Sequence, residues 1–210
     1  MTKLLSFHNN PAIKQQTLHR LKIHLSLDEI IKGTGYDNGR GCAVGCTLNE
    51  YNHKAYENEL GLPEWLARLE DVIFENLPDG LHKTFPLEMI EAIPVGVCTE
   101  KVGHIIAIKR LVSLAQKNLE VTDVIMAVVD LHERTLEGEE IKEGEWERAA
   151  RSIWAIWAGA ARSARSAVEA VAWVAWVARP GESGASGESA RSAHWVTERD
   201  NLLAALRSLT

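Results

Sequence analysis

Hydrophobic residues recur every three or four positions along most of the chain, which is the spacing that gathers them on one face of an α-helix. The clearest stripe consists of Leu62, Leu66, Leu69, Ile73 and Leu77. The alternation of apolar and polar residues that is typical of strands is almost absent. The pattern therefore predicts an all-α protein, a multi-helix bundle.

Capping residues, prolines and glycines predict where the helices begin and end. The expected helices cover residues 11–25, 26–32, 52–60, 63–77, 85–93, 102–117, 122–136, 145–179 and 190–209. Within 145–179, the pair Trp154 and Trp157 recurs 19 residues later as Trp173 and Trp176. Because that shift turns the second pair by roughly 100° about a helix axis, the segment is either one helix buried on two faces or two helices packed as a hairpin.

Residues 33–47 interrupt the helical pattern with five glycines, at positions 33, 35, 39, 41 and 45. Within them, Asn38-Gly39 is a strong signal for a two-residue turn between antiparallel strands, because both residue types tolerate a positive φ. We expect a glycine-rich loop or a small β-hairpin here.

The chain has 210 residues, 46% of them hydrophobic, which is enough to bury a sizeable core. Seven aromatic residues are tryptophans, and most of these lie in an alanine-rich part after residue 150. Small residues let helices approach closely and tryptophan fills the remaining space, so tight packing is expected there. Composition thus predicts a helical domain over 1–142 with the glycine-rich loop. It also predicts an Ala/Trp-rich helical hairpin over 143–210 that packs on this domain as one compact unit or forms a homo-oligomer.

The formal net charge is −6, and the acidic excess lies in residues 61–148. A chain of this charge is not built as a general nucleic-acid binder, so nucleic acid is not expected as a partner. No apolar run reaches the ~18 residues that span a bilayer, so no membrane partner is expected. Three cysteines without a secretory signal favour free thiols and a cytoplasmic location.

The glycine-rich loop is the first candidate for a binding site. Glycines let the backbone approach a ligand closely, and a helix that begins soon after Cys42 would point N–H groups at a small anion. The residues expected to bind are Asp28, Glu29, Tyr36, Arg40, Gly41, Cys42, Cys46 and Thr47. No cofactor is predicted, because the loop matches neither a phosphate-binding loop nor a dinucleotide fingerprint. The alternative is a compact loop whose glycines allow tight packing and whose cysteines are buried.

Two kinds of chemistry are open at this loop. A Cys42 thiolate with His24 and Asp28 has the residue types of a nucleophilic triad. Cys42 and Cys46 share a helix face and, with His53, could form part of a zinc site, although the usual Cys-x-x-Cys spacing is missing.

Other titratable residues have simpler interpretations. Glu70, Asp71 and Glu75 lie on the polar side of the helix over 63–77, and we interpret them as a solvated face. His132 lies on an apolar stripe and is expected to be a buried histidine with its hydrogen bonds satisfied.

Several motifs resemble a group of uncharacterised bacterial and phage-encoded proteins. They are Gly39-Arg-Gly-Cys-Ala-Val-Gly-Cys-Thr47, Glu59-Leu-Gly-Leu-Pro-Glu-Trp-Leu-Ala-Arg-Leu-Glu-Asp71 and Ile93-Pro-Val-Gly96. The resemblance covers residues 20–97, and beyond them it extends to composition alone. It implies no reaction, but it implies that one set of positions belongs together in a site or structural knot: Asp28, Glu29, Gly41, Cys42, Cys46, Tyr56 and Trp65.

Three functions fit these patterns. The first is a binding protein, of phage or mobile-element origin, that takes a small anionic ligand or a protein partner; the absence of a complete catalytic motif favours it. The second is an enzyme that uses a cysteine thiolate or an Asp/Glu pair beside the loop. The third is a purely structural helical oligomer.

Overall fold

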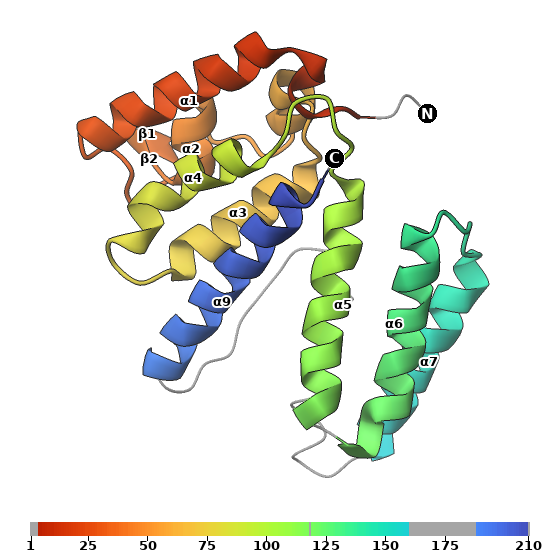
Figure 1. Cartoon of the computed structure of the whole chain (residues 1–210). Helices are drawn as coiled ribbons and strands as arrows, with labels where there is room; N and C mark the ends of the chain where they lie inside the picture. Colours follow the sequence, from red (N-terminus) through yellow and green to blue (C-terminus); the bar gives the residue numbers. More distant parts are fainter. Residues whose placement is uncertain (1–3, 118, 160–187, 210) are drawn as a thin grey trace. The chain divides into compact units, whose positions relative to one another are not determined.

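The computed structural model describes residues 4–117, 119–159 and 188–209. These residues are mostly helical and contain a single small antiparallel sheet of two strands (Figure 1). The predicted all-α, multi-helix fold with a small hairpin is therefore confirmed. None of the helices in the described ranges is long and apolar enough to cross a membrane.

The chain groups into two compact units, Met1–Glu100 with Glu182–Thr210, and Lys101–Gly181. These units differ from the predicted segments 1–142 and 143–210. The physical reason is that the last helix packs against helices of the N-terminal unit, a long-range contact that composition does not reveal.

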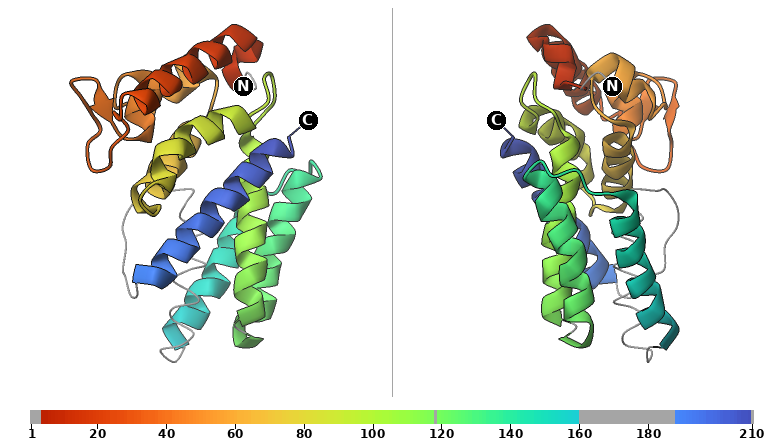
Figure 2. Two further views of the ribbon diagram at one scale, coloured as in Figure 1. Left: turned by 60° about the vertical axis from the view of Figure 1, so that its left-hand side comes forward. Right: turned by 90° about the vertical axis from the view of Figure 1, so that its right-hand side faces the viewer.

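The N-terminal unit is a layered helical assembly. Its elements are η1 (Ser6–Asn9), α1 (Pro11–Ser26), β1 (Tyr36–Asp37), β2 (Arg40–Gly41), α2 (Ala43–Leu48), η2 (Tyr56–Leu60), α3 (Glu64–Asn76), α4 (Leu81–Ala92) and α9 (Glu188–Arg207). In it α1 packs on α2 and α4, α3 lies against α2 and α4, and α9 covers α3 and α4 (Figure 2). The core includes Phe7, Leu21, Phe74, Phe85 and Met89, none of which is exposed to solvent.

The second unit contains α5 (Glu100–Lys117), η3 (Leu119–Val121), α6 (Thr122–Leu136) and α7 (Glu143–Gly159). Helices α6 and α7 pack side by side (Figure 1). A buried cluster joins them to the end of α5: Leu111, Ala115, Val121, Ile125, Val128 and Val129. Residues 160–179 of the segment 145–179 lie outside the described residues, and Trp173 and Trp176 are among them. The choice between one helix and two therefore stays a prediction.

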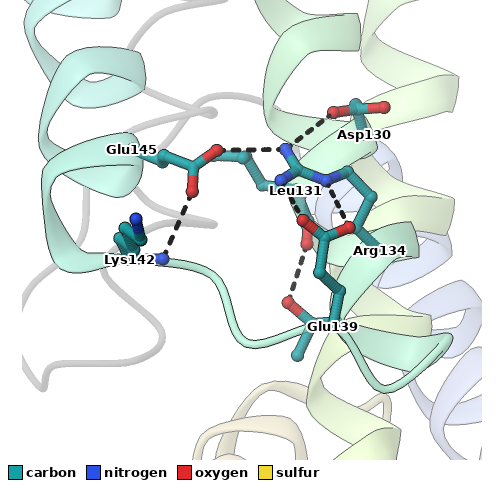
Figure 3. Close-up of polar contacts among 7 residues, drawn as sticks. Asp130, Leu131, Arg134, Glu139, Lys142 and Glu145 are labelled. Atoms are coloured by element: carbon teal, nitrogen blue, oxygen red, sulfur yellow. Dashed lines mark hydrogen bonds and ion pairs between the residues drawn. The ribbon is translucent and has the colours of Figure 1, made fainter.

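Arg134 closes the connection between α6 and α7. Its guanidinium donates to the carboxylates of Asp130, Glu139 and Glu145, at 3.4, 2.8 and 3.1 Å (Figure 3). Glu145 also accepts from the Lys142 backbone N–H at 3.3 Å. Because a guanidinium presents five donors in a planar fork, the Arg134 side chain can bind three carboxylates at once. One of them is on α6, one is in the connection and one is on α7.

The hairpin forms as the Asn38-Gly39 signal predicts. Tyr36 pairs with Gly41 across the strands, and Asn38 and Gly39 have φ values of 48° and 85°. A positive φ at both turn residues matches the right-handed twist of the flanking strands, which is why this dipeptide sets the turn.

The predicted helix over 26–32 is wrong. The chain leaves α1 at Ser26, whose hydroxyl donates back to the Ile23 carbonyl instead of capping a new helix. Beyond it, the Gly41 N–H donates to the Glu29 carbonyl and the Ile31 N–H donates to the Gly41 carbonyl. Tertiary pairing with the hairpin thus overrides the local capping signal.

Candidate functional site

The glycine-rich loop folds directly onto α2. A Cβ atom on Gly45 would lie 1.9 Å from the Gly35 carbonyl oxygen, and one on Gly41 would lie 2.4 Å from the same oxygen. Cys42 precedes the first residue of α2, a short helix that the expected helices did not include, and its N–H donates to the Thr34 carbonyl at 2.7 Å. Gly41 and Gly45 are therefore needed for close packing of backbone on backbone.

Three backbone donors of the loop, those of Gly33, Gly41 and Cys42, are used inside the protein. The Gly33 N–H donates to both carboxylate oxygens of Glu75, at 3.0 and 3.2 Å. The Gly41 and Cys42 N–H groups donate to carbonyls of the loop and of the segment before it. Helix α2 has six residues and no exposed first turn. The N–H groups of Gly33, Gly41 and Cys42 are therefore already occupied, and those of the first turn of α2 belong to buried residues.

His24 anchors the loop from the end of α1. Its Nδ1 lies 2.7 Å from Glu29 Oε2 and its Nε2 lies 2.8 Å from Asn49 Oδ1, and Tyr36 Oη donates to that same oxygen at 3.2 Å. Both ring nitrogens of His24 therefore lie within hydrogen-bond distance of side chains from two other segments, and this fixes the ring between the loop and the end of α2. The sequence prediction included Glu29 and Tyr36 but missed Asn49, the residue that joins them.

The predicted triad of Cys42, His24 and Asp28 does not form. His24 is bound by Glu29 and Asn49, while Asp28 is exposed and paired with the Lys83 ammonium group. The hydrogen bond and the charge of Lys83 hold the pKa of Asp28 below its usual value. Asp28 has a φ of 56°, and this left-handed residue turns its side chain away from α1 toward α4.

Both predicted cysteine ligands are buried thiols. Cys42 and Cys46 are 1% and 0% exposed. Burial raises the pKa of both, with the Asp71 charge adding to the effect on Cys42, and the pKa of Cys46 reaches about 12. The Cys46 thiol donates to the Gly41 carbonyl at 3.4 Å. Neither thiol has the electropositive surroundings that activate a cysteine nucleophile.

The weak zinc set of Cys42, Cys46 and His53 is also not assembled. His53 lies against Asp71, 3.2 Å from its Oδ2, whereas the Cys46 sulfur faces Gly41. Within the described part of the chain, no three His, Cys, Asp or Glu side chains are placed to hold a metal ion together.

Asp71 is the centre of the polar cluster beside the loop. Its Oδ2 accepts hydrogen bonds from Tyr51 Oη at 2.9 Å and from His53 Nε2 at 3.2 Å. Burial acts to raise the pKa of Asp71, but hydrogen bonds from His53, Cys42 and Tyr51 outweigh it and keep the pKa below its usual value. Asp71 is therefore an ionised carboxylate whose Oδ2 accepts from two side chains, while its Oδ1 is buried and has no hydrogen-bond partner among the described residues.

Glu70, the residue before Asp71, has a raised pKa, whereas the pKa of Asp71 is lowered. Glu70 is 0% exposed, accepts from the buried Tyr56 hydroxyl through Oε2, and its Oε1 has no hydrogen-bond partner among the described residues. Burial, reinforced by the Asp71 charge and opposed by the Tyr56 hydrogen bond, raises the pKa of Glu70 to about 8. Glu70 is thus mostly protonated near neutral pH.

The interpretation of Glu70 and Asp71 as a solvated face is wrong. Glu70 stands four residues after Leu66 and three before Ile73, so it falls on the apolar stripe of α3. That position was a readable signal for burial. The partners Tyr51, Tyr56 and His53 were not predictable, because they come from the irregular segment between α2 and α3.

The remaining predicted residues separate by exposure. Thr47 is buried, and its carbonyl accepts from Arg20 Nη1 at 2.5 Å. Arg40 is exposed, together with Asp37 and Asn38, at the end of the hairpin. Of the residues predicted to bind a ligand, Thr47 therefore lies in the buried base of the loop and Arg40 lies at its exposed tip.

The second unit contains its own polar contact. His104 and His132 approach through their Nδ1 atoms at 2.8 Å, and the His132 ring meets the edge of Trp146 at a centroid distance of 5.0 Å. Burial and the neighbouring His104 lower the pKa of His132 to about 4. His132 is therefore hydrogen-bonded through Nδ1 and packs on Trp146, but it is half-buried and not fully buried as its place on the apolar stripe predicts.

Compared with known proteins, the chain matches no family model, no curated protein and no solved structure. The resemblance of residues 20–97 to bacterial and phage-encoded proteins stays a prediction.

Proposed function

We propose that this chain is a binding protein that recognises a protein partner through the exposed end of its glycine-rich loop. The observation that carries the proposal is the division of that loop. Its base is held by internal hydrogen bonds, and its tip, Asp37 to Arg40, presents exposed side chains.

The chemistry of the base favours binding over catalysis. The thiols of Cys42 and Cys46 are buried with raised pKa values, which keeps them protonated near neutral pH. Among the two classes of ligand expected from the sequence, a protein partner is favoured over a small anion, because the N–H groups of Gly33, Gly41 and Cys42 already have acceptors.

A loop whose conformation is fixed in the free protein is well suited to binding a protein partner. The bonds from His24 to Glu29 and Asn49, and the bridge from Ile30 to Gly41, fix the hairpin relative to α1 and α2. Binding to such a loop loses little conformational entropy, which raises affinity for a given contact area.

The test is a double variant of the tip, Asp37→Ala with Arg40→Ala, immobilised beside the wild-type chain in a host-cell lysate. The matched control is Glu147→Ala with Arg151→Ala, which removes one exposed acid and one exposed base from α7. We expect a protein that the wild type and the control capture and the tip variant loses. A protein captured equally by all three, or captured by none of them, contradicts the proposal.

The oligomeric alternative rests on the Ala/Trp-rich part, of which 160–187 lies outside the described residues. Light scattering of the full chain tests it, since a monomer at all concentrations would remove its basis. A phage or mobile-element origin rests on the resemblance alone.

A further inference from the structure

Tyr51 combines exposure with immobilisation. The residue is 52% exposed, yet its hydroxyl donates to Asp71 Oδ2 at 2.9 Å and its ring meets the His53 ring edge-on at a centroid distance of 4.9 Å. The base of the ring rests on Gly35, where a Cβ would lie 2.6 Å from Tyr51 Cγ. Three contacts therefore hold an aromatic ring that leaves half its surface in water.

A ring that is exposed but already fixed in the free protein favours the binding of a partner. An exposed tyrosine that is fixed in the free protein has little rotamer entropy left to lose when a partner covers it. Tyrosine is also among the residues that contribute most to protein interfaces. Val72, the residue after Asp71 on α3, is 42% exposed and adds apolar surface to the same stretch of the helix.

The charges that act most strongly on Tyr51 are negative. Burial raises the pKa of Tyr51 to about 12, followed by the hydrogen bond and charge of Asp71 and by the influence of Cys42 and Glu75. Asp71 and Glu75 stand four residues apart on α3, the spacing that places two side chains on one helix face. Burial and the Asp71 charge raise the pKa of Glu75, while the Gly33 N–H and Lys32 oppose that rise. The Asp71 carboxylate is ionised.

We propose that Tyr51, Asp71 and Glu75 form a docking site for an arginine side chain of the protein partner. The guanidinium stacks on the exposed tyrosine ring, where the ring quadrupole attracts a cation. Its N–H groups donate to the half-buried Glu75 carboxylate, and its aliphatic stem packs on Val72. Asp71, whose Oδ1 is buried and whose Oδ2 already accepts from Tyr51 and His53, contributes its negative charge without a direct hydrogen bond. Arginine fits better than lysine, because the planar guanidinium both stacks on a ring and forms several hydrogen bonds in one plane.

This inference rests on the proposed function, since it names the chemistry of the partner at the base of the same loop. The net negative charge of the chain makes any cationic probe bind to some extent, so the test must separate stacking from charge. Two fluorescein-labelled peptides of equal charge do this, one with three Gly-Arg-Gly repeats and one with three Gly-Lys-Gly repeats, followed by fluorescence polarisation in 150 mM salt.

We expect the arginine peptide to bind the wild-type chain at least threefold more tightly than the lysine peptide. Tyr51→Leu, which keeps an apolar side chain but removes the ring, should weaken the arginine peptide about tenfold, the scale of a partly desolvated cation–π contact. Tyr51→Phe keeps the ring and should retain most of the affinity. Glu59→Gln, an exposed acid on η2, is the charge control and should change little.

Two outcomes overturn the inference: equal binding of the two peptides, or equal binding by the wild type and Tyr51→Leu. Unchanged circular dichroism and melting temperature of Tyr51→Leu exclude unfolding, and Tyr51→Phe gives a second comparison if that variant does not fold. Concentration-dependent self-association that Tyr51→Leu abolishes, without peptide binding, would assign the surface to a second copy and overturn the arginine partner.

If the hairpin-tip variant loses its captured protein while the arginine peptide fails to bind, this inference fails and the proposed function stands. If the peptide binds through Tyr51 and no protein is captured, the proposed function fails.

Discussion

The hydroxyl of Tyr56 donates a hydrogen bond to the Glu70 carboxyl group inside the N-terminal unit, where neither residue is exposed to solvent. The bond links the irregular segment before α3 to the apolar stripe of α3 itself. Because burial raises the pKa of Glu70 to about 8, the pair is held together in its protonated form at neutral pH. Asp71, one residue later, is ionised, so two adjacent carboxyl groups carry opposite protonation states.

Glu70 should make the folded state less stable as pH rises. Its pKa is raised from 4.5 to about 8 on folding, so its contribution is fully present below pH 4.5 and is lost as pH rises through 8. Between pH 6 and 8, about 2 kcal/mol of unfolding free energy should be lost. Urea unfolding of Glu70→Gln should show a flatter profile over this range, whereas Glu59→Gln should keep the wild-type slope. Parallel profiles for Glu70→Gln and the wild type would contradict a buried, protonated Glu70.

The thiols of Cys42 and Cys46 should react slowly in the folded protein. Both are buried and have raised pKa values, whereas Cys98 is half-buried. Iodoacetamide at pH 7.5, followed by peptide mass spectrometry, should label Cys98 first and label the other two at the rate of local opening, which urea accelerates. Labelling of Cys42 faster than a free model thiol would restore the nucleophile hypothesis.

Gly45→Ala should destabilise the N-terminal unit by about 3 kcal/mol, the upper part of the range for inserting a methylene into a packed site. The reason is the Gly35 carbonyl oxygen, 1.9 Å from the position of the new Cβ. Gly144→Ala is the matched control, because the nearest atom there is the Arg148 guanidinium at 3.8 Å. That helical substitution should be neutral or slightly stabilising. Equal unfolding midpoints for both variants would show that α2 and the loop do not pack as described.

His24→Ala should cost about 2 to 3 kcal/mol, because it leaves the half-buried Glu29 carboxylate without the His24 ring and removes one of the two contacts of Asn49 Oδ1. His19, on the exposed side of the same helix, gives the control His19→Ala. Amide hydrogen exchange should rise at Tyr36 and Gly41 in the first variant alone. If exchange at the hairpin stays unchanged in His24→Ala, the network does not hold the loop.

Local signals predicted most of the fold. The Asn38-Gly39 turn and the stripe of α3 could be predicted because turn chemistry and helical periodicity act over a few residues. The helix expected over 26–32 failed, since long-range pairing of Glu29 and Ile31 with Gly41 replaced it.

The candidate site was predictable only in part. The loop and its glycines were identified, but the arrangement of the side chains depends on contacts between distant segments. Asp71 meets Tyr51 and His53 across 20 and 18 residues of sequence, and no periodicity encodes that meeting. For Glu70 we predicted a solvated face, although its spacing from Leu66 and Ile73 places it on the apolar stripe, from which its burial could have been predicted.

The most direct test of the central claim, recognition by the tip of the hairpin, is photo-crosslinking with p-benzoylphenylalanine in place of Asp37, an exposed residue outside the positive-φ turn. The same photo-reactive residue in place of Glu147, exposed on α7, is the control. A single protein partner that crosslinks at position 37 and not at 147, and that is lost when Arg40→Ala is added, is the predicted result. The same set of weak crosslinks at both positions would contradict it.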